Sequence, residues 1–231
     1  MENDTPERIQ PDYKAQAKRQ LSGNWGIAIG FTLIYAFIPI ILISLITVIT
    51  VINLTYDINI QSVSYVVTIL VSPLALSSVI FYSRLSKKKK VSVGTIFSGF
   101  KYLIASSVIY LVLNGLMIIN GLVAIYSSRD GIFLSLVMAI VTCFITLYYR
   151  MSYYIIAVED NISVTKALAK SKKNMYGHKM ELFLLELSYI GWVFVSLVTL
   201  GIALLWIVPY MELTLANFFL NNYQPEAEQL Y

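Results

Sequence analysis

The sequence predicts an all-α fold: a polytopic transmembrane helical bundle with six spans. Three observations predict it, namely the scarcity of charge, the length of the charge-free runs and the placement of basic residues between those runs. Of the 231 residues, 58% are hydrophobic and 13% are charged, whereas a soluble domain is about 45–50% apolar and about 25% charged. A chain with so little charge cannot cover its surface with polar groups, so we expect lipid to be its main solvent.

Four charge-free runs are long enough to cross a bilayer, at residues 25–52, 63–83, 102–126 and 132–149. About 20 helical residues cross a hydrocarbon core of roughly 30 Å. Continuous apolar runs are typical of helices rather than of the alternating strands of a membrane barrel. The first run exceeds the roughly 7–15 residues of a signal-peptide core, so we expect it to stay as a membrane anchor.

The C-terminal apolar region allows two interpretations. Residues 182–220 are interrupted only by Glu186 and Glu212. They form either two helices that turn near Thr199-Leu200-Gly201, which makes six spans, or one helix over residues 187–211 with an interfacial tail, which makes five.

The basic residues predict the orientation of the chain. Sixteen of the 17 Lys and Arg residues lie before the first span, between the second and third, or from Arg150 to Lys179, and only Arg129 lies elsewhere. The positive-inside rule places the N-terminus and both basic loops in the cytoplasm, and six spans bring the C-terminus to the same side.

A threefold repeat is predicted within a single membrane domain over residues 1–231. Gly23, Gly99 and Gly177 each end a polar segment before an apolar run, and their spacings of 76 and 78 residues are close to one third of the chain. We expect three units, each an interfacial segment followed by a helical hairpin. The units cover residues 13–83, 91–150 and 163–220, with polar tails at 1–12 and 221–231. The repeat favours six spans over five.

Two of the polar segments have the pattern of amphipathic helices. Tyr13, Ala17 and Leu21 share one face of the first segment. In the other, apolar and small residues at positions 164, 168, 171 and 175 oppose three lysines. We expect such helices to lie at the interface with their lysines toward anionic headgroups. The tetralysine run is predicted to rest on the same lipids, with a docking site for a protein partner as the alternative. The predicted lipid contacts are Lys87, Lys88, Lys89, Lys90, Lys166, Lys170 and Lys173.

Ionisable groups within spans are candidates for function because their burial in hydrocarbon costs about 2.5–3.5 kcal/mol. Glu212 is predicted to be the deepest, about 16 Å from Gly201 along a helix. It is either a hydrogen-bonded carboxyl of the bundle interior or a group that titrates or binds a cation in a transport path. The asparagines of the third span precede glycines and are predicted to pack helices together. The candidate intramembrane polar site comprises Glu212, Glu186, Arg150, Asn114 and Asn120.

No catalytic, cofactor or metal motif is found in the sequence. Cys143 and His178 are the only residues of their kinds, which argues against a disulfide, a thiolate metal site and acyl-transfer catalysis. The net charge of +4 lies in short segments between apolar runs, so we expect lipid headgroups rather than nucleic acid as its counterpart. A lipid-modifying enzyme would need clustered carboxylates near the interface, such as Glu159, Asp160, Glu181 and Glu186.

Several short motifs resemble a known family. They are Ser171, Met175 and Gly177, then residues 187–192 (LSYIGW), 199–202 (TLGI), Leu205-Trp206, Pro209-Tyr210 and 216–219 (ANFF), with Ala17-Lys18, Leu21 and Gly23-Asn24-Trp25-Gly26 near the N-terminus. They resemble the domain-of-unknown-function family nine-seven-five of bacterial integral membrane proteins, common in Gram-positive species. Phe219 departs from the expected tyrosine. The resemblance implies a bacterial plasma membrane and around six helices, and it implies no activity or catalytic residue.

These observations predict a non-enzymatic accessory protein for envelope maintenance or protection from membrane-active peptides, with membrane lipids as partners. The alternative is a small transporter or channel that uses Glu212, acting as an oligomer. A polar cavity at the midplane that reaches Glu212 would favour transport, whereas a Glu212 that faces only neighbouring side chains would favour the accessory role.

Overall fold

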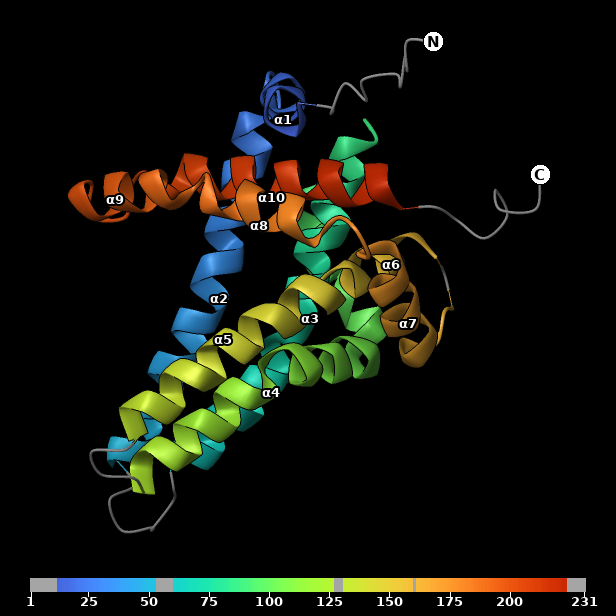
Figure 1. Cartoon of the computed structure of the whole chain (residues 1–231). Helices are drawn as coiled ribbons and strands as arrows, with labels where there is room; N and C mark the ends of the chain where they lie inside the picture. The colour runs from blue at the N-terminus through green and yellow to red at the C-terminus, as the bar shows by residue number, and fades with distance from the viewer. Residues whose placement is uncertain (1–11, 53–59, 127–130, 160, 224–231) are drawn as a thin grey trace, which may run out of the picture.

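The computed structural model describes residues 12–52, 60–126, 131–159 and 161–223, and in these ranges the chain is helical with no strand (Figure 1). The predicted all-α membrane fold is confirmed. The elements are α1 (Tyr13–Leu21), α2 (Trp25–Ile52), α3 (Ile60–Ser86), the 3-10 helix η1 (Val93–Tyr102), α4 (Leu103–Tyr126), α5 (Gly131–Tyr149), α6 (Met151–Val158), α7 (Val164–Asn174), α8 (Lys179–Leu187), α9 (Ile190–Val198) and α10 (Leu204–Asn222).

Among the described residues, five helical stretches have the length and hydropathy of membrane spans. They are Trp25–Val48, Val93–Leu116, Phe133–Val158, Lys179–Val198 and Leu204–Asn222. The predicted second span lies in α3, which is 27 residues long. The fourth run continues past Arg150 into α6, as expected, and the C-terminal region forms two helical arms, as the six-span interpretation requires.

The turn between the C-terminal arms satisfies its own backbone. Gly201 has a positive φ of 86°, and its N–H donates to the Ser196 carbonyl at 2.7 Å. The hydroxyl of Thr199 accepts from the N–H of Ala203 at 3.1 Å. Glycine adopts this left-handed conformation without steric cost. The predicted turn at Thr199-Leu200-Gly201 is therefore confirmed.

The long helices form two groups in Figure 1. Helices α3, α4 and α5 run side by side along one diagonal, and α2 joins them at one end, whereas α8, α9 and α10 cross the upper part of the view. Helix α10 packs against α1, α2 and α3, and α8 packs against α5. The third hairpin is thus joined to the bundle through α10 and the α5–α8 contact.

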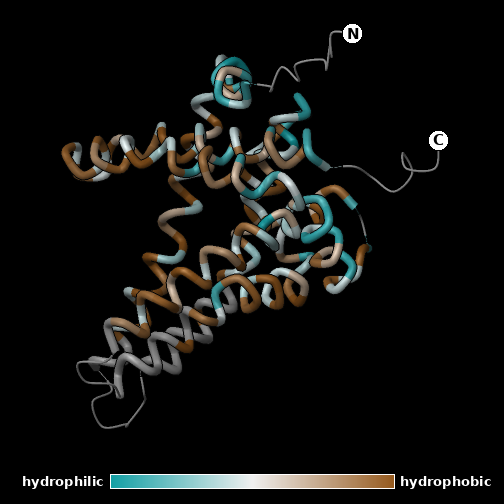
Figure 2. Tube along the Cα trace, viewed as in Figure 1, coloured by the Kyte–Doolittle hydropathy of each residue, from teal (hydrophilic) through white to brown (hydrophobic). Residues whose placement is uncertain are grey.

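Polar residues gather at α1, α7 and the adjoining helix ends, whereas the coloured parts of α2, α4, α5 and α9 are mostly apolar (Figure 2). The predicted apolar face of α1 is confirmed, because Tyr13, Ala17 and Leu21 are all buried. This face packs mainly on α10, where the Tyr13 ring lies 5.5 Å from that of Phe218. The first described helix is therefore held by the last described one.

Helix α7 is amphipathic as predicted, but its less polar face does not lie free for a bilayer. Ala167, Ser171 and Met175 are fully buried. The Ser171 hydroxyl donates to the Tyr148 carbonyl at 2.9 Å, and α7 packs on α4, α5 and α6. This face therefore packs against protein, and the expected contact of the α7 lysines with headgroups stays a prediction.

The three glycines that suggested a repeat have different structural roles. Gly23 and Gly177 have positive φ angles of 85° and 88° and follow α1 and α7. Gly99 lies inside η1, and its N–H donates to the Ser77 hydroxyl of α3 at 2.9 Å. A short segment does precede each pair of long arms, yet the threefold repeat and its boundaries stay a prediction.

Candidate functional site

The three ionisable residues predicted within the spans lie together in one cluster. Arg150 lies at the turn between α5 and α6, Glu186 in α8 and Glu212 in α10. The Arg150 Nη1 donates to Glu186 Oε1, and its Nη2 lies 4.0 Å from Glu212 Oε1. The side chains are 30%, 31% and 27% exposed, respectively. The cluster therefore brings both arms of the third hairpin against the bundle.

Each member of the cluster lies near an irregularity in its helix. Arg150 separates α5 from α6, and Glu186 is one residue from the end of α8. Glu212 follows Pro209, which lies inside α10 and has no backbone N–H to donate. The Tyr189 hydroxyl, just beyond α8, donates to Thr214 Oγ1 at 2.8 Å. These contacts hold the two arms in register around the guanidinium.

Tyrosines from three further elements surround the cluster. Tyr35 of α2, Tyr82 of α3 and Tyr154 of α6 are near enough to Glu212 to interact with it electrostatically. The Tyr82 hydroxyl is hydrogen-bonded to Thr32 at 2.9 Å, and the Tyr154 ring lies 4.4 Å from that of Phe219. Sequence reasoning missed these phenols, and the density of tyrosine on both sides of Arg150 is a visible signal for Tyr154 alone.

The predicted asparagines do not join the cluster. Asn114 donates to the Tyr110 carbonyl of its own helix at 3.1 Å. It lies eight residues, or about 12 Å, beyond Ser106, whose carbonyl accepts from Tyr153 at 3.4 Å near the cluster end of α4. Asn120 is within α4, but its side chain lies outside the described ones. A packing role for both stays a prediction.

The tetralysine run follows directly on α3 and closes it. The N–H of Lys89 donates to the Arg84 carbonyl at 2.9 Å and that of Lys88 to Leu85 at 3.0 Å. Lys88 has a positive φ of 53°, in the position where glycine is usual. A lysine there costs about 1 kcal/mol relative to glycine.

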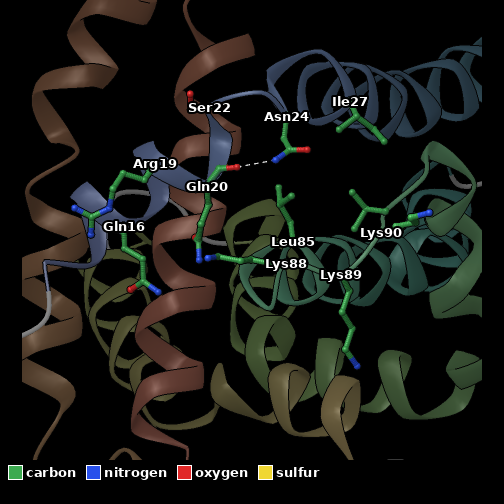
Figure 3. A pocket seen from close by; sticks show the side chains of 11 residues that line it. Gln16, Arg19, Gln20, Ser22, Asn24, Ile27, Leu85, Lys88, Lys89 and Lys90 are labelled. Atoms are coloured by element: carbon green, nitrogen blue, oxygen red, sulfur yellow. Dashed lines mark hydrogen bonds between the residues drawn. The ribbon is translucent and has the colours of Figure 1, made fainter.

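A cavity of about 800 Å³ opens between α1 and the tetralysine run. In Figure 3 the Lys88 side chain extends toward Gln20, whereas Lys89 and Lys90 point in two other directions. The cavity is lined by the cations Arg19, Lys88, Lys89 and Lys90, by the polar residues Gln16, Gln20, Ser22 and Asn24, and by Ile27, Leu85 and Val91.

Gln20 is held by hydrogen bonds that join three helices. Its Nε2 donates to the Ser86 carbonyl and its Oε1 accepts from Asn217 Nδ2, both at 2.9 Å. The Ser86 hydroxyl donates to Asn217 Oδ1 at 2.6 Å. This network connects α1, α3 and α10, so the wall of the cavity is fixed by residues far apart in the sequence.

The lysines of α7 differ in their surroundings. Lys170 Nζ lies 2.9 Å from both carboxylate oxygens of Glu159, and Glu159 also accepts from the Tyr223 hydroxyl. Lys166 and Lys173 are exposed. The predicted lipid contacts on α7 thus include one ammonium group that a protein carboxylate already binds.

The carboxylates that a lipid-modifying enzyme would need lie in separate contacts. Glu159 binds Lys170, Glu186 binds Arg150, and Glu181 Oε2 lies 3.2 Å from His178 Nδ1, while Asp160 lies outside the described residues. In the described part of the chain, no three His, Cys, Asp or Glu side chains gather as a metal site. Glu159, Glu181 and Glu186 therefore lie in three separate contacts rather than in one cluster.

Comparison with known proteins supports the resemblance seen in the sequence. A family model described as "Protein of unknown function (DUF975)" matches residues 130–224. The matched range contains Arg150, Glu186 and Glu212, whereas the tetralysine run lies outside it. Neither a curated protein nor a solved structure matches the chain. The description names no activity, so no residue role is transferred.

Proposed function

We propose that the protein is a non-enzymatic accessory protein of the bacterial plasma membrane that contributes to envelope maintenance or to protection from membrane-active peptides. Both termini are cytoplasmic in this proposal. Its support is that the first and last described helices meet: the Tyr13 hydroxyl accepts from Asn221 Nδ2 at 3.2 Å. The basic residues concentrate at this end of the molecule, as expected for a cytoplasmic face.

The observation that carries the proposal is the gathering of cations around two cavities at this end. One is the 800 Å³ cavity beside α1. The other, of about 520 Å³, lies between α3, η1 and α6 and is lined by Arg84, Lys87, Lys89 and Lys101 among others. Each basic residue near an anionic leaflet contributes about 1 kcal/mol to its attraction. Such a face can hold or screen anionic lipids without chemistry.

Deletion of the gene tests the accessory role. We expect the deletion strain to become several-fold more sensitive to cationic membrane-active peptides, measured as the minimal inhibitory concentration. Expression of the wild-type chain from a plasmid should restore resistance. If growth, lipid organisation and peptide sensitivity are all unaltered by deletion, the proposed function is wrong.

A second candidate, a small transporter or channel acting as a homo-oligomer, is favoured by the charge of the intramembrane cluster. One arginine faces two glutamates, so the cluster carries an excess negative charge when all three groups are ionised. Glu212 is the more loosely held carboxylate, at 4.0 Å from Arg150 Nη2. A proton or a monovalent cation on Glu212 would neutralise the cluster. The two cavities described above are lined by other residues, and neither includes Glu212.

Glu212→Gln separates the two functions. The accessory role predicts that this variant still restores peptide resistance, because the amide keeps the shape and removes only the excess charge. Transport predicts loss of proton or cation flux, measured in proteoliposomes with an internal pH- or cation-sensitive dye. Wild-type liposomes without flux would eliminate transport, whereas flux abolished by the substitution would eliminate a purely accessory role.

A further inference from the structure

The 520 Å³ cavity has the dimensions and walls of a ligand site. It lies between the C-terminal end of α3, η1 and the end of α6, and it falls within the usual range of about 300–1,000 Å³ for ligand pockets. Its lining residues are the cations Arg84, Lys87, Lys89 and Lys101, the serines Ser83 and Ser98, and the less polar Ile80, Phe97, Tyr102, Ala157 and Val158.

We propose that this cavity binds the phosphate group of an anionic membrane phospholipid. The proposal rests on the proposed function only in requiring that the cavity face the anionic leaflet. The proposal places a specific binding site, made by the residues that line the cavity, on the basic end of the molecule. The accessory role by itself requires only that this end be basic.

The cavity is lined by positive charge, which favours a bound anion. No carboxylate is found among the described residues that line it. Burial lowers the pKa of Lys87, and the neighbouring Lys89 lowers it further. The folded chain thus holds cations close together at a cost, and a bound phosphate would offset their repulsion.

Ser83 supplies a neutral donor at the same place. Ser83 is 4% exposed, and its hydroxyl oxygen is buried with no hydrogen-bond partner in the described part of the chain. Helical serines usually bond a carbonyl one turn back, as Ser77 does to Pro73 at 3.0 Å. An unpaired buried hydroxyl costs about 1–3 kcal/mol. Rotation of this side chain toward the cavity that Ser83 lines would let a phosphate oxygen accept from the hydroxyl.

The apolar wall favours a lipid over a free anion. Phe97 of η1, which lines the cavity, is 68% exposed. Inorganic phosphate has no apolar group to pack against this exposed ring, whereas the glycerol and acyl groups of a phospholipid would cover it. The cations and Ser83 would then hold the phosphate while the aromatic side contacts the rest of the lipid.

Purified full-length protein in nanodiscs provides the test. Thermal unfolding is measured in phosphatidylcholine and in phosphatidylcholine with phosphatidylglycerol, and retained lipid is counted by native mass spectrometry. We expect phosphatidylglycerol to raise the melting temperature of the wild type. Arg84→Gln with Lys87→Gln should weaken phosphatidylglycerol binding about thirtyfold and leave stability in phosphatidylcholine unchanged or higher. Lys18→Gln with Lys172→Gln removes the same charge from exposed positions of α1 and α7 outside the cavity and should retain the lipid.

Ser83→Ala keeps the test valid even if the double variant fails to fold. It changes no charge, and loss of one hydrogen bond to a charged group should weaken retention about tenfold. Equal loss of lipid in the cavity variant and in the control double variant, or full retention by Ser83→Ala, would overturn the site. Stabilisation of the wild type by inorganic phosphate in phosphatidylcholine, matching that by phosphatidylglycerol, would overturn the lipid as its ligand. These readouts use purified protein, so they stand or fall separately from the deletion phenotype.

Discussion

Arg150→Met is expected to lower the free energy of unfolding by about 3 kcal/mol. Removal of the guanidinium leaves Glu186 without its hydrogen-bonded partner and Glu212 without its nearest cation. The two carboxyl groups of the spanning arms are then left without their shared cation, and the third hairpin loses the ion pairs that join it to the turn between α5 and α6. Equilibrium unfolding in mixed micelles with increasing dodecyl sulfate, followed by circular dichroism, measures the change.

The matched controls distinguish charge pairing from packing. Arg19→Met also removes an arginine, at an exposed position of α1, and should change stability little. Adding Glu186→Gln and Glu212→Gln to Arg150→Met removes every charge of the cluster and should recover most of the loss. A single variant as stable as the wild type, or a triple variant no better than the single one, would contradict the ion-pair role.

Much of the fold could be predicted because hydrocarbon imposes simple requirements on a helix. The first charge-free run, residues 25–52, coincides with α2 (Trp25–Ile52). Helix α3 exceeds its predicted span of residues 63–83 at both ends, since a helix continues into polar surroundings wherever its backbone still bonds itself. The glycine turn after Thr199 separated two arms that hydropathy alone left joined.

The individual residues of the charge cluster could be predicted from the sequence, but their proximity in the fold could not. Arg150, Glu186 and Glu212 stand out singly because each is costly in a span, but no local pattern indicates that α8 and α10 meet the turn between α5 and α6. The amphipathic period of α7 has a similar limit. Periodicity identifies a helix face that is buried away from water, but it does not indicate whether lipid or protein covers that face. In the structure, protein covers it.

Gly99 illustrates the same limit for a single residue. In the sequence it resembles Gly23 and Gly177, which end polar segments, but in the structure it is the point where η1 touches α3. A Cβ at this position would lie 2.0 Å from the Pro73 carbonyl oxygen and 2.6 Å from Ser77 Oγ. Only the packing of two distant segments reveals why a side chain is excluded.

Gly99→Ala should therefore lower the free energy of unfolding by about 3 kcal/mol, because the added methyl group meets backbone and forces η1 away from α3. Gly94→Ala is the matched control in the same 3-10 helix. Its Cβ would meet only Ser92 Oγ at 3.6 Å, an ordinary contact, so we expect little change.

The two alanine variants also connect the packing to the lipid cavity. Because η1 carries Phe97, Lys101 and Tyr102 into the wall of that cavity, its displacement in Gly99→Ala should reduce phosphatidylglycerol retention along with stability, whereas Gly94→Ala should keep both. Unfolding in mixed micelles and native mass spectrometry on the same preparations measure the pair of effects. Equal stability of the two variants would show that the close approach of Gly99 to α3 does not hold η1 in place. The wall of the cavity that η1 forms would then have to be positioned by other contacts.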